Sequence, residues 1–221
     1  MRNNYNQIAG QRTQRIEAIS DGVFAIALTL LIFNIKVPVG ISIKSEKNLI
    51  DAFVGLTPQI LSYFLSFITL GIYWSAHSTQ FHFIDKSDRN LNWINLFFLL
   101  FVSTIPFTTA FLSQYITFKF AIFLYWFNIT MLGLVLALHW NYARNNNFIS
   151  LSENENATVT KAIKRRVIES SLLYTFGVLL SFINSYLSIF VLIFIQLNYA
   201  LALLPIFGKR KKKSKVQDET V

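Results

Sequence analysis

Apolar residues are concentrated along this chain in six long runs, separated by polar connections. A helix rises about 1.5 Å per residue, so about 20 apolar residues cross the roughly 30 Å hydrocarbon core of a bilayer. The runs predict an all-α membrane protein with six spans, at about residues 18–37, 49–83, 91–113, 118–141, 168–184 and 187–207. Pro58 is expected to separate a short lead-in helix from the second span. In the longest connection, residues 152–156 are expected to form a loop and a helix to begin near Thr160.

The basic residues of the connections predict how the spans are oriented, because cytoplasmic connections are enriched in Lys and Arg. With the N-terminus in the cytoplasm, only four of the 20 Lys and Arg residues lie on the other side: Lys36, Lys44, Lys47 and Lys119. Removing one span would move two basic segments to that side. We therefore expect six spans, a multi-pass protein of the cell membrane, and both termini in the cytoplasm.

The first run differs from the others because charged residues stand at its start: Arg15, Glu17 and Asp21. The uncharged stretch Gly22–Phe33 has 12 residues and would form a helix of about 18 Å, shorter than the hydrocarbon core. A span here brings Asp21 or Asn34 close to the membrane, where such groups usually face a bundle interior or a water-filled path. Ser20 and Asp21 are also common helix N-cap types. We interpret the run as an interior helix; the alternative places Asp21 among the lipid headgroups.

The composition agrees with a membrane protein and excludes other classes. Hydrophobic residues make up 53% of the 221 residues and charged residues 14%. The absence of cysteine excludes disulfides, thiolate metal sites and cysteine nucleophiles. The formal net charge of +9 does not indicate nucleic-acid binding, because the basic residues lie in the connections and in the cluster Lys209–Lys213. Since this cluster follows the last span, we predict a six-helix unit over residues 1–208 and a basic cytoplasmic tail over 209–221 that contacts anionic membrane lipid.

A candidate polar cluster joins the first two spans. Trp74 and His77 are three residues apart and share one face of the second span. A buried Asp21 needs hydrogen-bond donors, and Arg15, the Trp74 indole and a His77 ring nitrogen can supply them. His77 is expected level with Asp21 on the antiparallel first helix. The alternative is that Trp74 and His77 belong to the belt of aromatic side chains at the membrane surface.

A carboxylate beside an imidazole can serve as a general base, but the sequence lacks the rest of an active site. No nucleophile motif, metal-ligand spacing or phosphate-binding glycine loop occurs. His82 and His139 lie elsewhere and are expected to be isolated. We therefore expect no enzyme activity, no metal site and no cofactor.

One face of the first span carries a stripe with helical spacing: Ile26, Thr29, Leu30 and Phe33. Ala25 and Ala27 flank Ile26, and such small residues let a neighbouring helix approach closely. Thr29 is the only hydroxyl residue in the uncharged stretch. Ordinary helix packing would also produce such a stripe, so the stripe alone does not decide between packing and function.

Two motifs resemble the transmembrane protein 175 family in its single-repeat prokaryotic form. Residues 15–21 read R-I-E-A-I-S-D and resemble the family signature R-x-x-x-F-S-D, with Ile19 in place of the phenylalanine. Residues 22–31 continue like the family's first helix. Residues 74–81 read W-S-A-H-S-T-Q-F and resemble the W-x-x-H-x-x-x-F motif of its second helix.

The resemblance implies a potassium channel in which copies of the first helix line a central pore. Ile26 matches the bulky aliphatic ring that narrows the pore in the family. Thr29 and Leu30 then lie one turn further along, and Phe33 lies beyond them. No T-V-G-Y-G filter occurs in the sequence, so selectivity by a carbonyl cage is not expected.

The resemblance also implies a homotetramer, with potassium as the permeant ion. One copy of the pore helix cannot enclose a path, so a closed homo-oligomer is expected on geometric grounds as well. The resemblance further implies a structural polar network of Arg15, Ser20, Asp21, Trp74 and His77. Two other functions stay open at this point. One is a proton-coupled secondary transporter with Asp21 and His77 as the proton relay, whose transport would saturate; the other is a non-conducting membrane scaffold.

Overall fold

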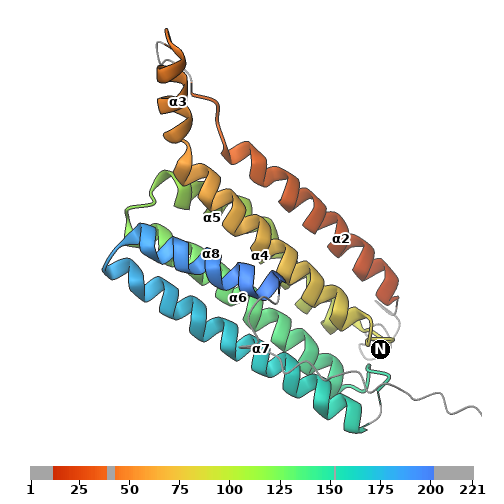
Figure 1. Cartoon of the computed structure of the whole chain (residues 1–221). Coiled ribbons are helices and arrows are strands. Elements are labelled where there is room, and N and C mark those ends of the chain that lie inside the picture. Colours follow the sequence, from red (N-terminus) through yellow and green to blue (C-terminus); the bar gives the residue numbers. More distant parts are fainter. Residues whose placement is uncertain (1–11, 39–42, 152, 202–221) are drawn as a thin grey trace, which may run out of the picture.

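The computed structural model describes residues 12–38, 43–151 and 153–201, most of which are helical (Figure 1). The helical elements are α2 (Thr13–Leu30), the 3₁₀ turn η1 (Leu31–Asn34), α3 (Glu46–Val54), α4 (Thr57–Phe81), α5 (Arg89–Gln114), α6 (Lys119–Asn145), α7 (Glu153–Leu179), the 3₁₀ turn η2 (Leu180–Phe182) and α8 (Ser185–Leu201). These described residues contain an isolated antiparallel bridge between Ile84 and Ile149, and no strand. The predicted all-α class is therefore confirmed for the described part of the chain.

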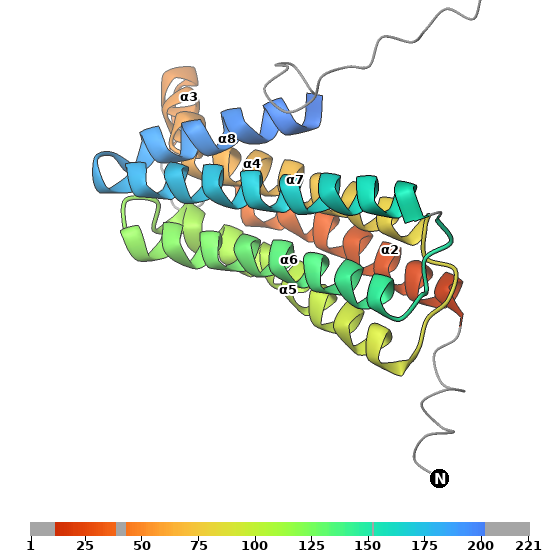
Figure 2. The same ribbon diagram turned by 90° about the horizontal axis from the view of Figure 1, so that it is seen from below.

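Within the described residues, the long helices run side by side in an elongated bundle, whereas α3 projects from one end (Figures 1 and 2). α2 lies at one edge of the bundle and packs against α4 and α5. α6 packs against α5 and α7, and α8 lies against α4 and α7. The described residues of a single copy therefore cover only one side of α2.

The core of the bundle consists of large apolar side chains from α2, α4, α5 and α6. Examples that are at most 1% exposed are Phe24, Leu65, Phe98, Tyr125 and Leu132, which belong to one continuous cluster. Lipid tails are as apolar as these side chains, so close packing and interhelical hydrogen bonds hold such helices together. The polar contacts described below are therefore part of the fold.

Four helical segments of the described chain are long and apolar enough to cross a membrane: Thr13–Asn34, Thr57–Phe81, Arg89–Gln114 and Lys119–Asn145. Two shorter apolar segments, Leu172–Phe182 and Ser185–Asn198, fall where the fifth and sixth spans are predicted. A helical membrane protein with four candidate spans is thus supported, and the count of six stays a prediction. The end of the sixth predicted span and the predicted basic tail, residues 209–221, lie outside the described residues.

The predicted lead-in helix before the second span is confirmed. α3 ends at Val54, and α4 starts at Thr57 with Pro58 in its first turn. Proline is tolerated there because the first N–H groups of a helix have no intrahelical partner. Pro58 therefore marks the start of the span, as its position in the sequence indicates.

The first helix begins earlier than the sequence pattern predicts. α2 starts at Thr13 instead of near residue 18, so Ser20 and Asp21 lie inside the helix and do not cap it. The Ser20 hydroxyl donates to the Ile16 carbonyl one turn back, 2.7 Å away. Ile16 is buried, so the bundle extends its packing beyond the uncharged stretch. With η1 the helical segment has 22 residues, about 33 Å, which is long enough to span a bilayer.

α7 also begins earlier than predicted, at Glu153, so the expected loop over residues 152–156 is helical from its second residue. A polar contact with α6 accompanies this extension. The Trp140 indole N–H donates to the Thr160 hydroxyl oxygen at 3.0 Å, and the Thr160 hydroxyl donates to Asn156 Oδ1 at 3.2 Å. The apolar pattern could not indicate the extension, because its first contacts are polar.

Candidate functional site

The two sides of α2 have different surroundings. The buried residues follow one face, which packs on α4 and α5: Ile16, Ser20, Phe24, Ala27 and, in η1, Leu31. On the opposite face Ile26 is 60% exposed, Leu30 44% and Phe33 72%. Thr29 is exposed on this face as well. All four residues of the predicted pore stripe thus lie on the side of α2 that a single copy leaves uncovered.

The Thr29 hydroxyl is held by its own helix. Its oxygen lies 3.0 Å from the Ala25 carbonyl oxygen and 2.9 Å from the Ile26 carbonyl oxygen, so its one hydrogen is donated to the backbone. The lone pairs of the hydroxyl oxygen remain for other contacts. Such an oxygen can contact a cation, but it has no hydrogen left to offer an anion.

Polar contacts also attach the end of this helical segment to α4 and α5. The Asn34 side-chain amide donates to the Pro106 carbonyl oxygen at 3.1 Å, and Pro106 lies inside α5. The Lys36 backbone N–H donates to Oε1 of Gln59 in the first turn of α4 at 3.0 Å. Asn34 marks the polar limit of the first run in the sequence, and in the structure it fixes the end of the stripe.

Asp21 and Trp74 form a direct contact between α2 and α4. The Trp74 indole N–H donates to Oδ1 of Asp21 at 2.9 Å. Asp21 is exposed and Trp74 is 46% exposed, so this bond lies at the border of the uncovered side of α2. The carboxylate therefore has one of the donors expected from the sequence and is not enclosed within a single copy.

His77 points to a different partner from the one expected. Its Nε2 lies 2.8 Å from Oδ1 of Asn95 on α5, and the Asn95 side-chain amide donates to the Ser20 hydroxyl oxygen at 3.0 Å. Ser20 in turn donates to the Ile16 carbonyl. Because Asn Oδ1 only accepts, Nε2 of His77 carries the hydrogen in this arrangement. The His77 ring stacks on Phe98 with a centroid distance of 5.2 Å, which holds its plane in place.

The residues predicted as one polar network therefore occupy three places. Asp21 and Trp74 meet at the surface, while Ser20 and His77 are joined in the interior through Asn95. Arg15 is exposed and takes part in neither arrangement within the described residues. Sequence reasoning missed Asn95, which follows Asn90 and Asn92 at the start of the third predicted span.

A second group of polar side chains lies deeper, on the buried face of α4. Its members recur about one helical turn apart and are all buried: Ser62, Ser66, Thr69, Tyr73, His77 and Gln80. Ser66 donates to the Tyr125 hydroxyl on α6 at 3.0 Å, and Thr69 lies 3.2 Å from the same oxygen. The Gln196 side-chain amide on α8 donates to the Thr69 hydroxyl oxygen. These bonds join buried side chains of α4, α6 and α8.

His139 belongs to this interior group, so the expectation that it is isolated is wrong. Its Nδ1 lies 3.0 Å from Oε1 of Gln80, and the Gln80 amide donates to the Leu136 carbonyl at 3.1 Å. The His139 and His77 ring centroids are 6.1 Å apart. Within the described residues, no group of three or more His, Cys, Asp or Glu side chains is arranged to hold a metal ion.

The fold and the half-covered α2 define a helical membrane protein whose first helix has an unoccupied face. Residues 15–106 match the family model described as endosomal/lysosomal potassium channel TMEM175. A potassium channel of Streptomyces collinus is 33% identical over 180 residues, which are 79% of this chain and 85% of the relative. The chain belongs to the TMEM175 family, and the resemblance of its two motifs is thereby confirmed.

A solved structure and the animal relatives extend the comparison. The crystal structure of a lysosomal potassium-selective channel TMEM175 homolog from Chamaesiphon minutus superposes with a TM-score of 0.72 and 30% sequence identity. That match covers 86% of this chain and 97% of the crystallised one. The endosomal/lysosomal proton channel TMEM175 of Danio rerio is 40% identical over 98 residues, 42% of this chain but 19% of the relative. The animal relative is therefore matched over about a fifth of its length.

Proposed function

We propose that this chain forms a potassium channel of the cell membrane, as a homotetramer with α2 of each copy lining a central pore. The observation that carries the proposal is the exposed stripe of α2, opposite a face that is packed on α4 and α5. Support comes from the bacterial relative named a potassium channel and from the Chamaesiphon minutus channel structure. A channel also agrees with the expectation that the chain has no catalytic residues.

In the proposed topology the chain crosses the membrane six times and both termini are cytoplasmic. The shorter apolar segments of α7 and α8 supply the fifth and sixth spans. α7 packs on α6, and α8 packs on α4 and α7, which supports a common orientation in the bundle (Figure 2). The unit over residues 1–208 then forms the channel, and the tail over residues 209–221 lies at the cytoplasmic membrane surface.

Four Ile26 side chains at one level form the narrowest part of the proposed pore. An apolar ring excludes water from a constriction, and an ion has to shed hydration to pass it. The Thr29 hydroxyl oxygens, with their lone pairs available, replace part of that hydration one turn further along. Leu30 and Phe33 continue the apolar lining, and potassium is the permeant ion, with no cofactor.

The polar contacts of α2 have a structural role in this proposal. Ser20, through Asn95 and His77, holds the covered face of α2 inside the bundle. Asp21 and Trp74 hold its edge, and Arg15 lies exposed near the cytoplasmic start of the helix. Neutralising Asp21 is therefore expected to affect assembly more than ion selectivity.

The test is potassium flux through purified protein in liposomes, followed by single-channel recording. Reversal potentials under bi-ionic potassium and sodium then compare the wild type with Ile26→Asn, Ile26→Ala and Thr29→Ala. Ile26→Asn wets the constriction and is expected to give the largest loss of potassium selectivity; Ile26→Ala widens it with a milder loss. Thr29→Ala is expected to lower selectivity without loss of the tetramer.

Leu138→Asn is a matched control, because Leu138 is 53% exposed on α6 and lies off the proposed pore. It should leave the reversal potential unchanged. Currents with unchanged reversal potentials in both Ile26→Asn and Thr29→Ala would place the filter elsewhere. Absence of any flux from well-folded protein would favour the scaffold.

The proton-coupled transporter is the second candidate; the animal relative is named a proton channel, which supports proton movement but not coupled transport. Nε2 of His77 is hydrogen-bonded to Asn95 at 2.8 Å, so a relay to Asp21 would have to use Nδ1 or break this bond. Saturating transport that depends on a proton gradient would support this candidate. Potassium flux that persists without a proton gradient supports the channel.

A further inference from the structure

Helix α3 has no buried residue, although it is amphipathic. It has nine residues, and the Ser45 hydroxyl oxygen caps its start by accepting from the Asn48 backbone N–H at 3.2 Å. The apolar side chains are spaced to share one face and are 48–62% exposed: Leu49, Ile50, Phe53 and Val54. By the same spacing Lys47, Asn48 and Asp51 lie on the other face, and Glu46 stands at the start of the apolar face. An amphipathic helix of this length gains little stability unless its apolar face is covered.

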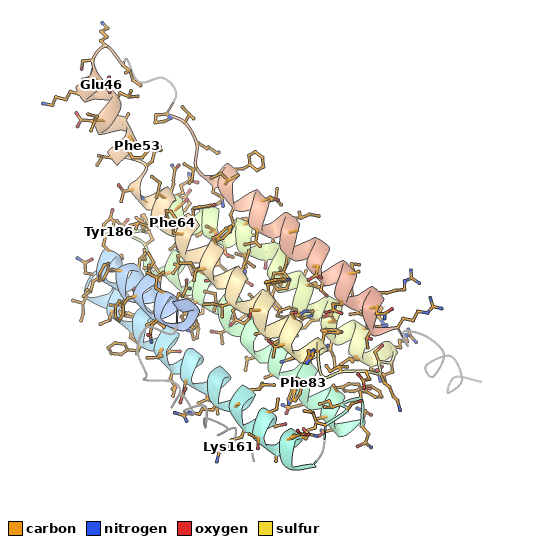
Figure 3. All side chains as sticks on the ribbon, turned by 45° about the vertical axis from the view of Figure 1, so that its right-hand side comes forward. Glu46, Phe53, Phe64, Phe83, Lys161 and Tyr186 are labelled. Atoms are coloured by element: carbon orange, nitrogen blue, oxygen red, sulfur yellow. The ribbon has the colours of Figure 1, made fainter. Side chains whose placement is uncertain are left out.

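The position of α3 limits what can cover it. Figure 3 shows Glu46 and Phe53 beyond the end of the bundle, on the side opposite Phe83 and Lys161. α4 has 25 residues, about 37 Å of helix, which already exceeds the roughly 30 Å hydrocarbon core. With α4 as the second span of the proposed topology, α3 would lie past the hydrocarbon region. Figure 1 shows it leaning from the line of α4 toward the side on which α2 lies.

The apolar face of α3 is poorly suited to binding a membrane surface. Helices that bind a bilayer lie in the plane of its interface, with Lys and Arg on their polar side. α3 stands off the end of the bundle instead. Its two acidic residues, Glu46 and Asp51, balance Lys44 and Lys47, so the segment offers no net attraction to anionic lipid. The same balance lets several copies of the segment come together without net repulsion.

A second copy of the chain is a better occupant. The exposed apolar side chains of α2 continue along the chain toward α3, through Phe33 at 72% exposure, Val37 at 81% and Ile43 at 42%. The proposed function places the α2 helices of four copies around one axis. Because α3 leans to the side of α2, it then reaches toward a neighbouring copy.

We propose that the apolar face of α3, formed by Leu49, Ile50, Phe53 and Val54, packs on a neighbouring copy of the chain at the outer mouth of the oligomer. This second contact between subunits lies outside the hydrocarbon core, whereas the α2 contact lies within it. The proposal rests on the oligomer of the proposed function but not on its ion selectivity. It gives the segment between the first two spans a role in assembly.

The test places photo-reactive benzoylphenylalanine at residue 53 in the full chain, reconstituted in liposomes of phosphatidylethanolamine and phosphatidylglycerol. Irradiation is expected to give covalent dimers and higher multiples of the chain. The same probe at residue 51, on the polar face, is the matched control and should give few. A probe at residue 26 reports separately on the α2 contact.

Each outcome decides one of the two proposals. Multiples of the chain from residue 53 support the α3 contact. Lipid adducts or no product at residue 53, together with multiples from residue 26, overturn it and leave the proposed oligomer intact. No multiples at either position, with a monomeric mass by light scattering, overturn both.

A second measurement uses dissociation of the oligomer in detergent on dilution. Phe53→Ser is expected to raise the concentration of half-dissociation about tenfold or more. Asp51→Ser is the control and should leave that concentration unchanged. Equal behaviour of the two variants would contradict the proposal.

Discussion

α2 and α6 are both apolar enough to cross a membrane, but they are buried to different extents in the bundle. In the most apolar 18-residue stretch of each, 28% of the segment that contains α2 is buried, against 50% of α6. α6 lies between α5 and α7, and α2 lies at the edge against α4 and α5 only. Similar hydropathy therefore places both helices in a membrane without telling which one is enclosed by its own chain. The uncovered half of α2 is what makes it a candidate for contact with other copies.

The polar side chains of the two helices show the same difference. Tyr125 and His139 of α6 are at most 1% exposed and have hydrogen-bond partners on α4. On α2 only Ser20 is enclosed in this way, and Asp21 and Thr29 lie on or near the uncovered side. Substitutions on covered surfaces should therefore lower the free energy of unfolding of the isolated subunit more than substitutions on uncovered surfaces.

The largest effect is expected for Phe24→Ala. Phe24 is 1% exposed, and its ring lies 5.9 Å from that of Phe98 and 6.1 Å from that of His77. Truncation leaves a cavity, and the expected loss is about 3–5 kcal/mol of the free energy of unfolding. Phe33→Ala on the same helical segment is the control, since Phe33 is 72% exposed. Denaturant unfolding of detergent-solubilised monomers measures both, and equal losses would remove the distinction between the two faces.

A smaller loss is expected for Tyr125→Phe on α6. The change removes a hydroxyl that pairs with Ser66 and Thr69 inside the bundle, and the hydrogen that Ser66 donates to it loses its acceptor, at a cost of about 1–3 kcal/mol. Tyr115→Phe is the matched control, because Tyr115 is 40% exposed. The same unfolding experiment compares them. If Tyr125→Phe unfolds like the wild type, the interior hydrogen bonds do not hold α4 to α6.

The smallest effect is expected for Trp74→Phe. It removes the indole N–H that donates to Asp21, but this bond is exposed, so a loss of about 0.5–1.5 kcal/mol is expected in monomers. Trp93→Phe on α5 is the control, with Trp93 60% exposed. A loss as large as that of Phe24→Ala would mean that the Asp21 contact, and not the packed face, holds α2 in place.

The sequence predicted the parts of the fold that depend on apolar runs and on breaks between them. The membrane class, the lead-in helix before Pro58 and the stripe with Ile26 and Phe33 all follow from residue spacing. The starts of α2 and α7 did not follow from the apolar pattern. The contacts near them are one buried apolar side chain, Ile16, and a polar hydrogen bond from Trp140 to Thr160.

The polar contacts were predictable in kind but not in pairing. Trp74 reaches Asp21 as the donor requirement of a carboxylate suggests. His77 instead pairs with Asn95, whose span lies next to α2 only in three dimensions. Many weak contacts decide which helices pack together. The sequence of one span therefore does not show which other helices each of its faces will contact.

The two interior attachments of α2 have a consequence for its rotation about its own axis. Ser20 is bonded to Asn95 near one end, and Asn34 is bonded to Pro106 at the other, about 20 Å along the helix. Successive residues of a helix differ by about 100° in direction, so a turn by one position would exchange Ile26 for an alanine on the outward side. Two distant fixed points prevent such a turn. The angular setting of the stripe is thus supported by two hydrogen bonds to α5, at Ser20 and Asn34, that do not involve Ile26 itself.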